Sequence, residues 1–349
     1  MRLISVIMPV LNEAECIQKT LDSLLQQSLS DIDLEFLLVD GGSTDGTREI
    51  IEHCAARDGR LRLLNNPRKK TPAGLNIGLQ AARGEFICIL GAHARYPRDY
   101  IRICLQELLA HAATGCSGRL VTVPANRSAG ARLAAWCLGH RYASSGSSAR
   151  THPGGFVDSI PYPLMYRRAL LEVGGYDEEL GRNQDNDMNY RLRQRGHKLY
   201  LTPLTWAYYQ SRPTVRALLS YAFQTGRWNA ITLFRTAASM SPRHFAPLIF
   251  LMTLIILGTS SLLLAVRQRS PALPLGVLAS LLALHFLMGL VAAVETFRRE
   301  HATAALALPS LILAFHVLYG AGTIAGFLGG YGWRAMAPRP QSVTEVVTR

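Results

Sequence analysis

The sequence lacks several features that would assign a function at once. None of its six cysteines has the C-x-x-C spacing of a zinc or redox site: Cys16, Cys54, Cys88, Cys104, Cys116 and Cys137. They lie in apolar or helical stretches, which predicts small buried side chains in a reducing compartment. The first residues, RLISVIMPVLNE, hold too short an apolar run for a secretory signal and predict a strand.

Charged residues are also scarce, at 17% of the chain, although the formal net charge is +13. Such a basic balance can indicate nucleic-acid binding. Lys and Arg are spread along the chain, however, with tight clusters only at residues 68–70 and 298–299, and there is no basic helix. We therefore expect no nucleic-acid partner, and anionic lipid headgroups or a phosphate-bearing ligand explain the charge more simply.

Long hydrophobic runs are what the chain has in excess. Residues 245–266, 273–294 and 302–330 contain no Asp, Glu, Lys or Arg, and each exceeds the roughly 18–20 residues that span a bilayer as a helix. The preceding segment, 214–240, mixes apolar and basic residues at helical spacing, which predicts amphipathic helices at a membrane interface. A solute transporter is disfavoured because no charged residue lies inside the runs.

Before these runs, strand and helix patterns alternate. The apolar stretches 3–10, 35–39, 60–64 and 86–90 predict strands, and Asn12, with Glu15 three residues later, predicts the start of the first helix. Short connections of this kind are typical of a mostly parallel sheet with helices on both faces. Because ligands in such sheets lie beyond the carboxyl ends of the strands, we expect loops 9–13, 40–45 and 91–95 to meet.

Four motifs then occur in order: VIMPVLNE, LLVDGGSTDGT, NQDNDMNYRL and QTGRW. Together they resemble the family-2 glycosyltransferases, over about residues 3–230, and GAHARYP and VDSIPY resemble the branch that builds bacterial exopolysaccharides such as succinoglycan. The resemblance implies an α/β fold, a GT-A (Rossmann-like) nucleotide-sugar domain with a mostly parallel sheet. We expect a catalytic domain over 1–212, interface helices carrying Q-x-x-R-W over 213–242, three transmembrane helices over 243–333 and a tail over 334–349.

The resemblance also implies the donor site. In the family the first Asp of the second motif, here Asp40, accepts a hydrogen bond from a uracil N3–H, which implies a UDP-sugar donor. Pro9 and Glu13 lie on the adjoining loop that contacts the nucleotide, and Lys70 and Arg227 are candidate cations for the diphosphate. Taken alone, Asp40 could equally be a carboxylate that closes the turn before GGST.

The metal motif of the family is altered here. Its usual D-x-D occupies positions 91–93, where this chain has Gly91, Ala92 and His93. A neutral imidazole suits Mn²⁺ better than Mg²⁺, so His93 is a candidate ligand, with direct donation to the diphosphate or a structural role as alternatives. Gly91 is expected to let the backbone approach a phosphate. Whether a metal is required stays open.

The resemblance places the catalytic base at Asp185, which would accept the proton of the acceptor hydroxyl. Gln184 stands where the family has Glu, which removes a negative charge beside Asp185 and should keep its pKa below that of a paired carboxylate. Asp187 is expected to cap the helix or form an ion pair. Candidate acceptor contacts are Asp158, Gln224 and Trp228.

These inferences predict a membrane-bound inverting transferase. It would move a hexose from a UDP-sugar to a polyprenyl-diphosphate-linked sugar during exopolysaccharide repeat-unit assembly, with glucose as the first candidate for the hexose. The catalytic domain would face the cytoplasm at the bacterial inner membrane, with the C-terminus outside if all three runs cross. Two alternatives remain: a non-catalytic partner subunit of a polysaccharide assembly complex, favoured by the missing carboxylates, and a processive polysaccharide synthase, which also uses Q-x-x-R-W.

Overall fold

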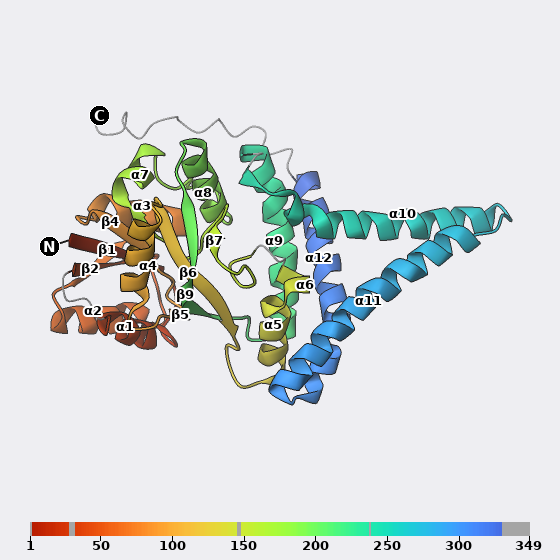
Figure 1. Cartoon of the computed structure of the whole chain (residues 1–349), viewed down its shortest axis with the longest axis horizontal. Coiled ribbons are helices and arrows are strands. Elements are labelled where there is room, and N and C mark those ends of the chain that lie inside the picture. The colour runs from red at the N-terminus through yellow and green to blue at the C-terminus, as the bar shows by residue number, and fades with distance from the viewer. Residues whose placement is uncertain (1, 28–31, 145–147, 237–238, 330–349) are drawn as a thin grey trace. The chain divides into compact units, whose positions relative to one another are not determined.

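The structure is a computed structural model that describes residues 2–27, 32–144, 148–236 and 239–329. The chain divides into two compact units that alternate along the sequence (Figure 1). Within the described residues, the first comprises residues 2–121 and His152–Tyr209, and the second comprises residues 122–151 and 210–329. Residues 122–151 therefore belong with the apolar helices, although they lie within the stretch 1–212 that we assigned to a catalytic domain.

The first unit is built on a mixed sheet whose N-terminal half is parallel. β2 pairs with β1 and β3, and β1 pairs with β4, all in parallel. Every residue of β2 from Leu34 to Asp40 is buried, as expected for a strand covered on both faces. The strands are β1 (Arg2–Val10), β2 (Ile32–Asp40), β3 (Leu61–Asn65) and β4 (Phe86–Ile89). The four strands predicted from the alternating pattern are thus confirmed.

The other half of the sheet is antiparallel, which the alternating pattern did not predict. The strand order is β3-β2-β1-β4-β8-β6-β9-β5, and β7 pairs with β9. The added strands are β5 (Ala94–Arg95), β6 (Gly115–Val123), β7 (Gly155–Phe156), β8 (Leu164–Tyr166) and β9 (Leu199–Gln210). The helices of this unit are α1 (Ile17–Leu25), α2 (Thr47–Arg57), α3 (Thr71–Ala81), α4 (Tyr100–Ala110), α7 (Arg167–Glu172) and α8 (Gln184–Gln194).

The predicted start of the first helix is wrong. Asn12 does not cap a helix, because α1 begins at Ile17 after Cys16. Asn12 instead has a left-handed backbone (φ 56°), a conformation that Asn tolerates better than most residues. Its side-chain oxygen accepts a hydrogen bond from the Thr44 amide (2.9 Å), so Asn12 joins two loops rather than starting a helix.

The second unit is helical. It contains α5 (Ala129–Gly139), α6 (Arg141–Ser144), α9 (Val215–Arg235), α10 (Ala246–Val266), α11 (Ala272–Glu300) and α12 (Leu308–Gly329), with 3-10 turns at Pro242–Phe245 and Thr303–Ala307. In the part of the chain that the structure describes, three helical segments are long and apolar enough to cross a membrane: Pro242–Val266, Ala272–Glu300 and Thr303–Gly329. The predicted interface segment forms one continuous helix, α9, up to Arg235. The predicted tail at 334–349 lies outside the described residues.

Candidate active site

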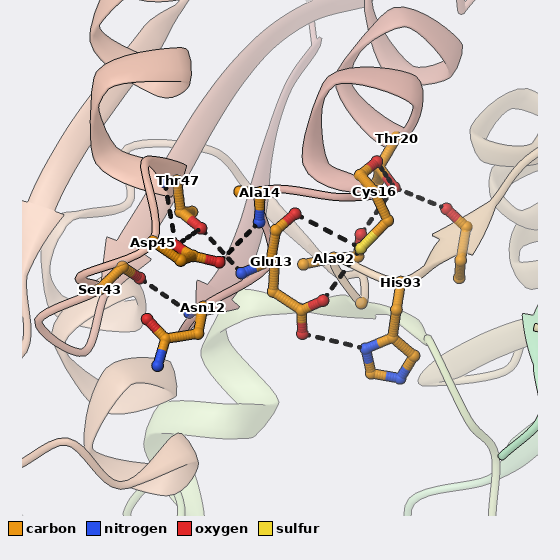
Figure 2. Close-up of polar contacts among 12 residues, drawn as sticks. Asn12, Glu13, Ala14, Cys16, Thr20, Ser43, Asp45, Thr47, Ala92 and His93 are labelled. Atoms are coloured by element: carbon orange, nitrogen blue, oxygen red, sulfur yellow. Dashed lines mark hydrogen bonds and ion pairs between the residues drawn. The ribbon is translucent and has the colours of Figure 1, made fainter. Parts of the chain in front are cut away.

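The three predicted loops meet at one edge of the sheet. The parallel register aligns Val10 of β1 with Asp40 of β2, so the loops that follow these strands leave the sheet at the same level. The Ala14 amide donates to Asp45 Oδ2 (3.0 Å), and the Thr20 hydroxyl donates to the carbonyl of Ala92 (2.7 Å). The expectation that these loops converge is confirmed (Figure 2).

Asp40 lies at the end of β2 and organises the loop that follows it. Its Oδ1 accepts hydrogen bonds from the Ser43 hydroxyl (2.6 Å) and the Ser43 amide (3.1 Å), and Arg48 lies 3.5 Å from Oδ2. The residue is only 2% exposed. Asp40 therefore closes the turn before GGST, which was the alternative to nucleotide binding. The contact with uracil stays a prediction, and it would require this loop to open toward the base. Pro9 lies one residue before the end of β1, opposite Val39.

Glu13 and His93 form a polar pair between the first and third loops. His93 Nδ1 lies 3.3 Å from Glu13 Oε1, and the Cys16 thiol donates to Glu13 Oε2 (3.0 Å). Burial acts to raise the pKa of Glu13, but the hydrogen bonds from His93 and Cys16 outweigh it and leave this pKa below its ordinary value. For Cys16, burial and the neighbouring Glu13 carboxylate raise the thiol pKa to about 12. Glu13 is therefore ionised at neutral pH and Cys16 is a thiol.

The ionised Glu13 determines how His93 presents its ring. A carboxylate can only accept hydrogen bonds, so we assign the proton to Nδ1 of His93. In a neutral ring the lone pair is then on Nε2, the nitrogen that faces away from Glu13 in Figure 2. A carboxylate behind a histidine is the usual arrangement for a metal-binding imidazole. The sequence motif alone did not show that Glu13 has this role.

Gly91 lies against the side chain of Tyr162. A Cβ at this position would lie 2.9 Å from the ring of Tyr162, while the Gly91 amide donates to the Tyr96 hydroxyl (2.8 Å). An aspartate, the usual family residue, would force the Tyr162 ring to move. The predicted phosphate approach stays untested, and the contact with Tyr162 is a second reason for a residue without a Cβ at this position.

These residues fit a divalent cation only in part. Among the described residues, no group of three or more His, Cys, Asp or Glu side chains could hold a metal ion. His93 offers a single nitrogen donor, oriented by Glu13. Any bound cation would therefore take most of its ligands from the diphosphate and water.

The basic cluster 68–70 turns in two directions. Lys70 Nζ lies 3.5 Å from Glu179 Oε2, and Arg68 pairs with Glu178. Lys69, by contrast, lies over the second loop, because a Cβ built on Gly42 would be 3.7 Å from its Nζ. Of the cluster, Lys69 rather than the predicted Lys70 is directed toward the loop that follows Asp40.

Asp185 is the second residue of α8 and is exposed to solvent. Its Oδ1 accepts a hydrogen bond from the Asn186 amide (2.9 Å), and no Lys, Arg or His pairs with it among the residues that the structure describes. Burial raises the pKa of the Asp185 carboxyl above its ordinary value, opposed by the Asn186 amide. A carboxylate can be reached by solvent while protein fills much of the space around it, and it then loses part of its hydration.

Asp187 behaves differently although it lies only two residues further on. It is 1% exposed and pairs with Arg191 (2.8 Å), whose guanidinium also donates to the Gly175 carbonyl (2.8 Å). The expected ion pair is confirmed. The first turn of α8 thus holds one carboxylate that is locked into the fold and one, Asp185, that is open.

The VDSIP loop packs against α8 near Asp185. Asp158 pairs with Arg193 (3.2 Å), and the Ser159 hydroxyl donates to Asn186 Oδ1 (3.1 Å). Beside Asp185, the side-chain oxygen of Gln184 is buried and has no hydrogen-bond partner within the described parts of the chain. An unsatisfied amide oxygen and an open carboxylate therefore lie next to each other on α8.

A series of contacts connects Asp40 with the loop before α8 inside the first unit. The Asn66 amide donates to the Asp40 carbonyl (2.7 Å), and the loop 66–70 reaches Glu178 and Glu179 through Arg68 and Lys70. In the loop that contains Glu178 and Glu179, the backbone amide of Tyr176 donates to Asn76 Oδ1 (2.7 Å). Burial, and to a smaller extent the negative charge of Asp185, raise the pKa of Tyr176. Sequence reasoning missed Asn66, which the consecutive asparagines after β3 could have indicated.

The remaining candidates, Gln224, Arg227 and Trp228, belong to the second unit. All three lie on α9. Arg227 is exposed, and Gln224 and Trp228 are half-buried. Their predicted contacts with the diphosphate and the acceptor stay predictions.

Comparisons with known proteins identify the family of the chain. The model of Glycosyl transferase family 2 matches residues 5–174. Succinoglycan biosynthesis protein ExoA of Rhizobium meliloti is 30% identical over 278 residues, covering 79% of this chain and 82% of ExoA. A Methanococcus voltae protein, dolichyl N-acetyl-alpha-D-glucosaminyl phosphate 3-beta-D-2,3-diacetamido-2,3-dideoxy-beta-D-glucuronosyltransferase, is 24% identical over 349 residues, covering 95% of this chain and 98% of that protein.

The fold itself has a solved counterpart. Mannosyltransferase PcManGT from Pyrobaculum calidifontis, solved in complex with GDP-Man and Mn²⁺, is 21% identical, with a TM-score of 0.58, and the match covers 94% of this chain and 87% of that one. This likeness shows a shared GT-A fold. With the extended match to ExoA and the motifs gathered at the sheet edge, the chain belongs to glycosyl transferase family 2.

Proposed function

We propose that this glycosyltransferase is an inverting, membrane-bound enzyme. It moves a hexose from a UDP-sugar to a polyprenyl-diphosphate-linked sugar, and glucose is the first candidate for this hexose. The observation that carries the proposal is Asp185: an exposed carboxylate at the start of α8, unpaired among the described residues, with a raised pKa. Asp187 in the same turn is consumed by an ion pair. Asp185 is therefore the carboxylate of this turn that is available for proton transfer.

In the proposed reaction Asp185 accepts the proton of the acceptor hydroxyl while that oxygen attacks the anomeric carbon. The bond between this carbon and the diphosphate oxygen breaks, and UDP leaves with the electron pair. Attack from the side opposite the leaving group inverts the anomeric configuration. The unsatisfied Gln184 oxygen can accept a hydrogen bond from a sugar hydroxyl and so help to orient the acceptor.

Negative charge grows on the diphosphate as this bond breaks and has to be stabilised. A bound divalent cation would supply that stabilisation. On this chain, Nε2 of His93 would hold it and Glu13 would orient the ring. Lys69, over Gly42, and Arg227 are the cations proposed to approach the diphosphate.

Two observations support a lipid-linked acceptor. Three helices among the described residues are long and apolar enough to cross a membrane, and the related Methanococcus voltae protein is named for a dolichyl phosphate substrate. Because nucleotide sugars are made in the cytosol, the proposal places the first unit on the cytoplasmic face of the bacterial inner membrane. The relation to ExoA supports a role in exopolysaccharide assembly.

The direct test is a donor screen with the full-length protein in membranes. Nucleotide release would be measured for a panel of UDP- and GDP-sugars, with and without a lipid-linked acceptor. We expect acceptor-dependent UDP release, greatest with UDP-glucose, and addition of a single sugar. Release of GDP, or of no nucleotide, would contradict the proposal, and a long polymer would indicate a processive synthase.

Metal dependence is tested by changing Glu13 and His93 separately. Loss of a carboxylate behind a metal-binding histidine typically weakens metal affinity by about 10–100-fold. We therefore expect Glu13→Gln to require about 10–100-fold more Mn²⁺ for half-maximal activity, and His93→Ala to lose most of the Mn²⁺ stimulation. Lys19→Ala, an exposed change on α1, is the control. If both variants keep the Mn²⁺ response of the unaltered enzyme, His93 is not a ligand.

The pH dependence of turnover tests the environment of Asp185. Only the ionised carboxylate can accept a proton, so kcat falls as pH falls through its pKa. Because this pKa is raised, we expect the acid limb of the kcat profile above the pH at which an ordinary Asp titrates, about 3.9.

Gln184→Glu provides the matched comparison. It places a second negative charge beside Asp185, disfavours ionisation and moves the acid limb further up. If the acid limb of the kcat profile is unchanged in Gln184→Glu, Asp185 is not the group that accepts the proton.

A further inference from the structure

The second unit contains three apolar helices that differ in what surrounds them. On α10 and α11 large apolar side chains are exposed along most of their length; Leu262 is 65% and Leu273 is 79% exposed. On α12 no residue between 311 and 327 is exposed. Length and composition qualify all three as spans, but α10 and α11 present far more apolar surface that lipid would have to cover than α12 does.

α12 is packed tightly along α9. A Cβ on Gly322 would collide with the backbone of Phe223, and one on Gly326 would lie 2.8 Å from the Ala230 Cβ and collide with the backbone of Arg227. Steps of four residues on both helices stay in contact, so the two helices run in parallel, side by side (Figure 1). Because bare backbones meet, neither helix can shift along the other without a clash.

The open face of α9 is polar. Arg216, Ser220, Gln224 and Arg227 follow one another at helical spacing. Arg216, Ser220 and Arg227 are exposed, and neither arginine pairs with a carboxylate among the described residues. The contact between Phe223 and Gly322 places Arg216 level with Phe315, near the middle of α12.

This pairing conflicts with a transmembrane α12. If α12 crossed the bilayer, Arg216 would lie near its centre with no carboxylate partner among the described residues, and an unpaired charge is costly there. Arg227 would be carried into the same bilayer at a shallower depth. At a membrane surface, by contrast, the polar face of α9 remains in water.

The arrangement of α10 and α11 also indicates that α12 does not cross the bilayer. They meet at a turn that carries Arg267 and Arg269 and diverge from it, while α12 lies across their other ends (Figure 1). A Cβ on Gly320 of α12 would lie 2.9 Å from Leu251 near the start of α10, and one on Gly289 of α11 would lie 2.6 Å from Pro309. α12 therefore closes the base of the hairpin rather than running along it.

We propose that the chain crosses the bilayer twice, through α10 and α11, and that α12 lies with α9 at the membrane surface. With 21 residues, α10 is about 31 Å long at 1.5 Å per residue, close to the roughly 30 Å hydrocarbon core. Arg267 and Arg269 then reach the headgroups of the far leaflet. The end of α12 then lies on the same side of the bilayer as the start of α10, and this conclusion does not depend on which sugar is transferred.

The test labels single introduced cysteines in the full-length protein with a membrane-impermeant maleimide, in right-side-out and inside-out vesicles. Lys19→Cys on α1 marks the first unit, Ser270→Cys marks the turn after α10, and Ser342→Cys lies beyond α12. All three cysteine variants are needed to assign the sides of the membrane. The unaltered protein measures the background labelling of the native cysteines. No donor or acceptor is used, so failure of the proposed reaction cannot affect the result.

We expect Ser342→Cys to react from the same side as Lys19→Cys, and Ser270→Cys from the opposite side. Reaction of Ser342→Cys together with Ser270→Cys would show three crossings and overturn the proposal. Reaction of all three from one side would overturn it as well, because the hairpin would then not cross. Fusion of a reporter enzyme after residue 349 gives an independent measurement of the same side.

Discussion

Replacing Asp185 by Asn is expected to reduce kcat by about 10²–10⁴-fold, the usual contribution of a general base. The amide keeps the shape of the side chain but cannot accept the acceptor proton at neutral pH. Asp185 bonds only to the neighbouring Asn186 amide among the described residues, so the fold should be unaffected. Steady-state UDP release and UDP binding, measured on the same preparation, separate the two effects.

This result would be specific if UDP binding stays within about twofold and the unfolding temperature is unchanged. Asp158→Asn is the matched control. It removes a different exposed carboxylate, which pairs with Arg193 of α8, the helix that carries Asp185. We expect a smaller loss there, mainly in the apparent affinity for the acceptor. Unaltered turnover in Asp185→Asn would remove this residue as the base.

Replacing Asp187 by Asn is expected to have its main effect on stability. The change leaves the guanidinium of Arg191 without its buried counter-charge, and breaking a buried ion pair from one side costs about 3–5 kcal/mol. Arg191 also holds the Val173 and Gly175 carbonyls, so the loop before α8 should loosen. Thermal unfolding of the protein in lipid would measure the loss.

The double variant Asp187→Asn with Arg191→Met controls for this effect. It removes both charges, so it should be more stable than Asp187→Asn alone. If Asp187→Asn unfolds at the temperature of the unaltered protein, the ion pair does not hold α8 in place. The contrast between the two aspartates would then lose its structural basis.

The parallel half of the sheet could be predicted because its strands are continuous apolar runs. β2 is buried from Leu34 to Asp40 and therefore stands out from its flanks. The antiparallel half could not be predicted in the same way. β5, β7 and β8 have two or three residues each, too few to show a period, and they form only because longer strands lie beside them.

Helix ends and side-chain partners were harder still. Asn12 and Glu15 match a capping pattern, but the Thr44 amide competes for the Asn12 side chain, and this long-range contact leaves no local signal. The motifs identified Asp185, Glu13 and His93 as candidates from their order along the chain. The pairing of Glu13 with His93 and the turn of Lys70 toward Glu179 depend on how distant loops meet.

The most direct measurement is a structure of the full-length protein with a non-hydrolysable UDP-sugar bound. The account predicts the uracil beside Asp40 and Pro9, the diphosphate near His93 and the anomeric carbon open toward the Asp185 carboxylate. A donor bound with its anomeric carbon turned away from Asp185, so that another group faces the acceptor side, would contradict the account.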